Sequence, residues 1–196
     1  MTGDLYITGD PAADDLLNTN PDALIIGMLL DQQVPLEWAF RGPFTISTRL
    51  GRLDPTAIAA MPEAAFVAVC CEKPAIHRFP AAMGRRIHAL CTVLTDEWHG
   101  RAETLWSDGC DGGTLAARVG ALPGFGVEKT QIFLALLAKR FGVRPNGWEA
   151  AAGVFADDEP RTIADCADAT SLAAVRAWKA DQRAAGRDKQ GRPASS

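Results

Sequence analysis

The sequence predicts an all-α fold. Prolines recur at positions that open helices, apolar residues recur at helical spacing, and no stretch shows the alternation of a half-buried strand. With 196 residues, of which 47% are hydrophobic and 22% charged, the chain has the composition of a globular protein and the length to bury a sizeable core. We expect about ten short helices joined by turns rich in proline and glycine.

Cap residues and prolines place the helix starts in order along the chain. Asn20 is expected to cap a helix that opens with Pro21, and Asp54 to cap another that opens with Pro55. The remaining predicted starts are Pro35, Pro62 and Pro80 as first helical residues, and Thr114 and Ser171 as caps.

Two later segments carry apolar residues at helical spacing. In the helix after Pro80, apolar residues recur every three or four positions, which predicts one buried face. These residues are Met83, Ile87, Leu90 and Leu94. The segment that ends near residue 141 is more apolar still and is predicted to lie in the core; its apolar residues are Ile132, Phe133, Leu136, Leu137 and Phe141.

Charge is distributed unevenly, although the formal net charge is only −4. Residues 1–24 hold five acids and no Lys or Arg, whereas segment 114–144 holds five basic residues against one acid. The end of the chain, 171–196, holds six basic residues against two acids. The chain is therefore acidic overall with local basic patches that could contact an anionic partner.

The five cysteines are odd in number, and two of them, Cys70 and Cys71, are adjacent. This arrangement suits neither a zinc site nor the four-cysteine run of an iron–sulfur cluster. We find no signal peptide and no apolar run of 18 residues, so a cytoplasmic protein with reduced thiols and no membrane partner is expected.

The stretch LPGFG, residues 122–126, packs two glycines and a proline between two predicted helices. Gly124 and Gly126 can adopt unusual backbone conformations and leave the main chain open to a close approach. The amides at the start of the following helix attract an anion, Lys129 adds a cation, and Leu122 and Phe125 are expected to anchor the turn on the core. The segment is equally compatible with an ordinary corner between two helices.

Three stretches carry a resemblance to a known family. LPGFGVEKT resembles the L-P-G-x-G hairpin of the helix-hairpin-helix (HhH-GPD) DNA glycosylase superfamily, and ALIIGMLLDQQVPLEWA resembles that superfamily's early helix with its Gln-containing turn. HRFPAAMGRRIHALCTVLTDEWHG is similar to the helix before the hairpin, and the best match is a small actinobacterial-type group. The resemblance covers about residues 20–150.

The resemblance implies two helical lobes with a cleft between them, in one domain of residues 1–186. One lobe would comprise about residues 21–141, and the other about residues 1–20 together with 142–186. The polar residues 187–196 are expected to form a disordered tail.

The resemblance further implies a monomeric base-excision-repair enzyme that acts on lesion-bearing double-stranded DNA at the nucleoid. The hairpin, including Leu122, Pro123, Gly124, Phe125, Gly126 and Lys129, would hold the DNA backbone without reading its sequence. Gln32 or Gln33 would fill the space left by a flipped base, and Trp38 and Trp148 would stack on that base, unless they are core residues. The carbonyls of Gly120, Leu122 and Phe125 would hold a monovalent cation, with no other cofactor.

The chain departs from the family at the catalytic positions. Asn146 falls where relatives carry an Asp that stabilises charge on the sugar, and a neutral amide cannot act as a base; Asn146–Gly147 also reads as a simple turn. Glu128 occupies the slot of the lyase Lys, with Lys129 displaced by one residue, so we expect no lyase step. Asp31 and Glu37 are alternative carboxylates, whose pKa values apolar surroundings could raise for general acid work.

These departures leave three functions open. The first is a monofunctional DNA N-glycosylase that hydrolyses the glycosidic bond of a damaged or misplaced base. The second is a glycosylase-fold protein that has lost hydrolysis and only binds distorted DNA, which Asn146 favours. The third is an unrelated helical interaction module.

Overall fold

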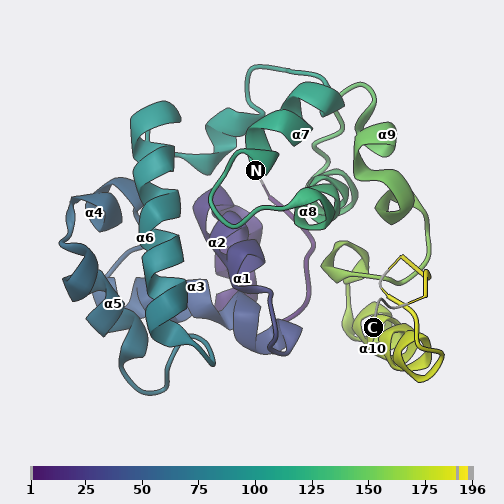
Figure 1. Cartoon of the computed structure of the whole chain (residues 1–196), viewed down its shortest axis with the longest axis horizontal. Helices are drawn as coiled ribbons and strands as arrows, with labels where there is room; N and C mark the ends of the chain where they lie inside the picture. Colours follow the sequence, from purple (N-terminus) through teal and green to yellow (C-terminus); the bar gives the residue numbers. More distant parts are fainter. Residues whose placement is uncertain (1, 189, 194–196) are drawn as a thin grey trace.

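The computed structural model describes residues 2–188 and 190–193, and these residues form an all-helical structure (Figure 1). In this part of the chain the structure has ten α-helices and three 3-10 helices, and its only β-type pairing is an isolated bridge between Arg187 and Pro193. The all-α prediction is confirmed. No described helix combines the length and the apolar composition that crossing a membrane requires.

Short connecting segments join successive helices along the chain. In that order they are α1 (Pro11–Thr19), α2 (Pro21–Leu30), α3 (Leu36–Leu50), α4 (Pro55–Ala60), α5 (Glu63–Cys71), α6 (Pro80–Glu97), η1 (Ala102–Leu105), α7 (Gly112–Gly120), α8 (Val127–Arg140), α9 (Trp148–Ala152), η2 (Gly153–Ala156), η3 (Ile163–Asp165) and α10 (Ala169–Ala184).

Helix α2 lies at the centre, with α4–α6 on one side of it and α8–α10 on the other (Figure 1). Every residue from Ala23 to Leu30 is buried, which fits a helix that is apolar all round and covered on all sides. Asn20 caps α2 as predicted, since its side-chain oxygen accepts hydrogen bonds from the amides of Asp22 and Ala23 at 2.8 and 3.2 Å. The central helix therefore supports both sides of the molecule.

The predicted apolar faces of α6 and α8 are buried. Met83 is 4% exposed and Ile87, Leu90 and Leu94 are 0% exposed, and α6 packs this face against α4 and α5. In α8 the residues from Ile132 to Ala138 are all buried, and Phe141 follows at the end of the helix with 8% exposure. Helical spacing in the sequence thus identified both buried faces correctly.

Several helix starts differ from the prediction. Asp111, not Thr114, caps α7, because the Asp111 carboxylate accepts the amide of Thr114 at 2.7 Å. Asp168, not Ser171, caps α10; Ser171 is instead the third residue of a reciprocal capping box with Asp168. In each case an aspartate three residues upstream already satisfies the amide. Pro35 and Pro62 stand one position before the helix, whereas Pro21, Pro55 and Pro80 open theirs as predicted.

Within the predicted tail, the described residues 187, 188 and 190–193 are drawn as a turn. Asp188 organises it: its carboxylate accepts the amides of Gln190 and Arg192 at 2.8 and 2.9 Å, and it pairs with the Arg192 guanidinium at 2.9 Å. An aspartate that accepts amides two and four residues ahead is typical of a local turn. Residues 189 and 194–196 lie outside the described residues.

Candidate functional site

The turn between α7 and α8 has a well-defined geometry. The amide of Phe125 donates to the carbonyl of Leu122 at 3.1 Å across Pro123 and Gly124, and Gly124 has a φ of +85°, as the third residue of a type II turn requires. Leu122 is 3% and Phe125 6% exposed, and the Phe125 ring lies edge-on to the Phe133 ring at 6.0 Å. Both anchor the turn as predicted, but the Phe125 amide is already used within it.

The turn docks on the C-terminal end of α2. A β-carbon on Gly124 would lie 2.3 Å from Leu29 Cδ1, so the turn backbone touches the Leu29 side chain directly. Lys129 makes a second contact, since its Nζ donates to the Leu29 carbonyl at 2.9 Å. Gly124 is therefore required by the fold, through both its positive φ and this contact.

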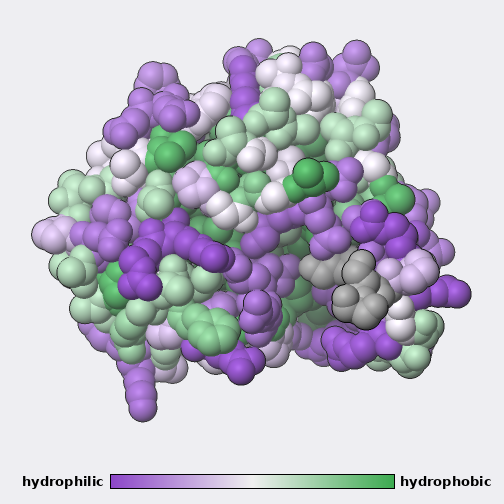
Figure 2. Space-filling model, viewed as in Figure 1, coloured by the Kyte–Doolittle hydropathy of each residue, from purple (hydrophilic) through white to green (hydrophobic). Residues whose placement is uncertain are grey.

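Gly126, by contrast, faces open space. It is exposed, has a φ of −90°, and a β-carbon on it would meet no atom within 4 Å. It caps α8, whose first amides have no carbonyl one turn earlier to bond, and Val127 beside it is 79% exposed. Hydrophilic residues spread across the middle of the molecular face on which this turn lies (Figures 1 and 2).

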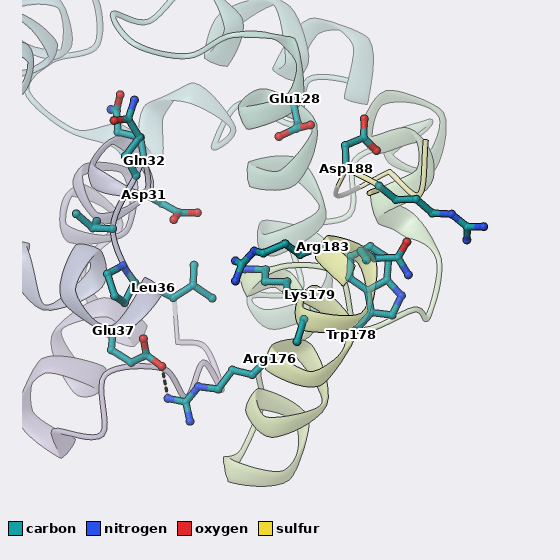
Figure 3. Close-up of a pocket in the computed structure, with 16 residues that line it drawn as sticks. Asp31, Gln32, Leu36, Glu37, Glu128, Arg176, Trp178, Lys179, Arg183 and Asp188 are labelled. Atoms are coloured by element: carbon teal, nitrogen blue, oxygen red, sulfur yellow. Dashed lines mark hydrogen bonds and ion pairs between the residues drawn. The ribbon is translucent and has the colours of Figure 1, made fainter. Parts of the chain in front are cut away.

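A cavity of about 850 Å³ opens between the turn that joins α2 to α3, the first turn of α8, and α10 (Figure 3). Its volume falls within the range of about 300–1,000 Å³ that is typical of small-molecule sites. The residues that line it are Asp31, Gln32, Gln33, Val34, Pro35, Leu36, Glu37, Glu128, Arg176, Trp178, Lys179, Ala180, Gln182, Arg183, Arg187 and Asp188.

Charged side chains of both signs line the cavity. Asp31 at the end of α2 and Glu128 on α8 turn their carboxylates toward the space from two sides, and Lys179 and Arg183 reach into it from α10 (Figure 3). Arg176, Lys179 and Arg183 recur at spacings of three and four, so they share one face of α10. In the sequence this region stands out as a basic end of the chain, and the spacing of the three residues is the signal that identifies a basic cavity wall.

The two glutamines of the α2–α3 turn differ in how firmly hydrogen bonds hold their side chains. The Gln32 side chain is held at both ends: its Nε2 donates to the Leu29 carbonyl at 2.8 Å and its Oε1 accepts from Arg86 at 2.7 Å. The exposed Gln33 has a φ of +59°, a left-handed conformation that strains a non-glycine residue. Of the two predicted residues, Gln33 has the freer side chain.

Glu37 forms an ion pair with Arg176 across the cavity, from α3 to α10 (Figure 3). Desolvation raises the pKa of Glu37, but the Arg176 hydrogen bond and the nearby charge of Lys179 outweigh it and lower that pKa below its ordinary value of 4.5. The expectation of a pKa raised for general acid work is therefore wrong for Glu37, because the sequence did not reveal the guanidinium opposite it.

Three predicted residues lie outside this cavity. Trp38 is 41% exposed, and its indole donates to the carbonyl of Ala75 at 3.2 Å. Asn146 is exposed in the loop before α9, where its carbonyl accepts the amide of Gly112 at 2.8 Å, and Trp148 packs partly buried against the core. The structure thus brings Asp31, Gln32, Gln33 and Glu37 together, and leaves Trp38, Asn146 and Trp148 apart from them.

The carbonyls of Gly120, Leu122 and Phe125 belong to the hairpin, and their fit to a monovalent cation can be judged from what surrounds them. The Thr130 hydroxyl is buried without a hydrogen-bond partner and lies 3.6 Å from where a Gly120 β-carbon would be. The Leu122 carbonyl also accepts the Phe125 amide at 3.1 Å, so one of the three carbonyls already has a partner within the turn. Among the described residues no group of three or more His, Cys, Asp or Glu side chains is arranged to hold a metal ion.

Comparison with known proteins gives no further indication of function. No family model matches the chain, and no curated protein matches it.

We expect Glu37→Gln to remove a pH-dependent contribution to stability. A carboxylate with a lowered folded-state pKa stabilises the fold above its ordinary value of 4.5, and this contribution disappears as the pH falls through the lowered pKa. The loss at pH 7 should stay below about 1 kcal/mol, because the pair is partly solvated. Both proteins are unfolded with urea at several values from about pH 2 to about pH 7, a range that covers the titration of carboxyl groups. The difference between their free energies of unfolding at each pH measures the contribution of Glu37.

Glu97→Gln, a change at an exposed acid near the end of α6, is the control for losing a surface carboxylate that has no part in this ion pair. A stability difference for Glu37→Gln that is equally flat from acid to neutral pH would contradict the assigned ion pair.

Proposed function

We propose that the chain binds double-stranded DNA through the α7–α8 turn and hydrolyses the glycosidic bond of a flipped base held in the cavity. It would be a monofunctional DNA N-glycosylase with two helical lobes, as the resemblance of its hairpin implies. The observation that carries the proposal is the shared element α8: the open amides at Gly126 and the cavity residue Glu128 are two positions apart on one helix start.

The turn supports the binding half of the proposal. Its exposed helix start can hold a backbone phosphate, and main-chain amides bind a phosphate whatever the base sequence. Residues 114–144 hold five Lys and Arg against one acid. The structure pairs Arg118, Lys139 and Arg140 of these with acids, so the support comes from the helix start itself. A phosphate fixed at Gly126 would bring the adjoining nucleotide to the cavity mouth.

The cavity supports the chemical half. It has room for a nucleotide, with acidic residues from α2, α3 and α8 and cations from α10, so that a base and its sugar phosphate could be accommodated together. Exposed Gln33 in its strained turn is suited to enter the stack in place of the flipped base. Lys129 does not line the cavity, and its Nζ donates a hydrogen bond to the Leu29 carbonyl at the end of α2. We therefore propose no Schiff base and no lyase step.

One observation favours a second candidate, a protein that binds distorted DNA without cleaving it. Asn146, the residue that matches the family's catalytic Asp, is neutral and lies outside the cavity. If no other carboxylate performs the role of that Asp, the protein binds DNA but does not hydrolyse the glycosidic bond.

A panel of duplexes separates the two candidates. We expect at least one duplex that contains uracil, hypoxanthine, an alkylated purine or an oxidised base to acquire abasic sites, seen as strand breaks after hot alkali. Without alkali the strand should stay intact, because no lyase step follows. Tight binding to lesion duplexes with no abasic site on any of them would favour the binding-only protein.

The binding role of the turn has its own test. Gly126→Val should weaken binding by about one to two orders of magnitude for every DNA sequence alike, since losing a hydrogen bond to a charged group costs roughly 1.5–3 kcal/mol. The fold should persist, because a side chain there enters open space. Binding isotherms at two salt concentrations measure the effect, with weaker binding at the higher one.

Gly113→Val is the matched control, since Gly113 lies in the first turn of α7 and its β-carbon would meet only Asp111, at 3.4 Å. Equal affinities of the Gly126→Val and Gly113→Val proteins for DNA would contradict a role of the α7–α8 turn in binding.

A further inference from the structure

We propose that His77, in its neutral form, is a positioning residue that fixes the backbone of the α2–α3 turn, and that protonation of its ring releases this turn. His77 lies in the segment between α5 and α6 and is only 1% exposed. What the turn does on DNA rests on the proposed function, in which Gln33 enters the stack in place of the flipped base.

The two ring nitrogens of His77 have different main-chain partners. Nδ1 lies 3.0 Å from the amide nitrogen of Phe79, and Nε2 lies 3.0 Å from the carbonyl oxygen of Gln32. Because an amide N–H can only donate and a carbonyl can only accept, Nδ1 is the acceptor and Nε2 carries the hydrogen. The partners therefore select one neutral tautomer. A second proton, on Nδ1, would face the Phe79 N–H and break that hydrogen bond.

The hydrogen bond from Nε2 holds the peptide plane that leads into Gln33. The Gln32 carbonyl and the Gln33 amide belong to one planar peptide group, so holding the oxygen also sets the direction of the Gln33 N–Cα bond. The φ of Gln33 is +59°, a conformation that persists only where the surrounding structure holds it. Within the described part of the chain, no main-chain hydrogen bond holds Gln33 or Val34. The contact from His77 is therefore the support nearest to the strained residue.

The surroundings of the ring favour its neutral form. Trp38 of α3 and Phe79 flank it with uncharged rings, at centroid distances of 6.3 and 6.1 Å. Burial lowers the pKa of His77 below its ordinary value of 6.5, and the positive charges of Lys129 on α8 and Arg86 on α6 lower it further. Hydrogen bonds to two main-chain carbonyls act in the opposite sense without outweighing these effects. At neutral pH the turn is therefore held, and acid releases it.

The first test needs no DNA. Imidazole ¹⁵N shifts and backbone amide shifts of the full-length protein are followed from about pH 8 to about pH 4, a range around the ordinary histidine pKa. We expect His77 to carry its hydrogen on Nε2 at neutral pH and to titrate with a midpoint below 6.5, with the amides of Gln33 and Phe79 shifting at that same midpoint. A hydrogen on Nδ1, a ring that does not titrate below 6.5, or amides that do not follow the ring would overturn the proposal.

The second test measures affinity for a lesion duplex relative to an undamaged one. As the pH falls through the His77 midpoint, the wild-type preference for the lesion should drop by about fivefold, the effect of one net hydrogen bond. His77→Gln keeps a donor at the position of Nε2 but does not titrate, so its preference should be independent of pH. His77→Phe keeps a ring without a donor and should show a low preference at every pH. A purely structural role would produce no such pH dependence.

His88→Gln is the matched control, since Nε2 of His88 also forms a hydrogen bond with a carbonyl, that of Met61 between α4 and α5, at 2.9 Å. It should behave as the wild type in both tests. If the lesion preference does not follow the His77 midpoint, the role of His77 on DNA is wrong and the proposed function stands. If the free protein titrates as expected but the wild type prefers no lesion duplex, the proposed function is wrong and the fixing of the turn by His77 stands.

Discussion

The contact between the α7–α8 turn and the end of α2 is the constraint on which the site depends. Gly124 lies directly against Leu29, and Lys129 bonds to the Leu29 carbonyl at 2.9 Å. This contact orients the start of α8 with its amides toward solvent and Glu128 toward the cavity. It also places that helix start beside Asp31 and the two glutamines. Because α2 is buried along nearly its whole length, the arrangement has a rigid support.

The cavity combines a basic wall on α10 with acids on α2, α3 and α8, and this polarity explains how an acidic chain could accept an anionic polymer. In the proposed function Arg183 and Lys179 would face a phosphate, while Glu37 is neutralised by Arg176. Asp31 and Glu128 line the same cavity from the end of α2 and the start of α8. Binding through amides and cations fixes position, so discrimination between bases must come from the shape and the hydrogen-bonding groups of the cavity.

The sequence predicted the helical class, the buried faces of α6 and α8, and the anchoring of the turn by Leu122 and Phe125, because these depend on local spacing and apolar burial. It could also place Asp31 and Glu37 near each other, since one turn joins them. It could not show that α10 folds back across the cavity to pair Arg176 with Glu37, a contact between residues far apart in the chain. Nor could it show that Asn146 lies beside Gly112 of α7 and outside the cavity.

The central claim is that the open amides at the start of α8 hold a DNA phosphate. Amide chemical shifts of the ¹⁵N-labelled protein, followed while a short lesion duplex is added, test it most directly. The account predicts that the largest shifts fall on Gly126, Val127 and Glu128, with the α2–α3 turn next and α4 and α5 unchanged. Saturable binding with shifts confined to other helices, and none at residues 126–128, would contradict it.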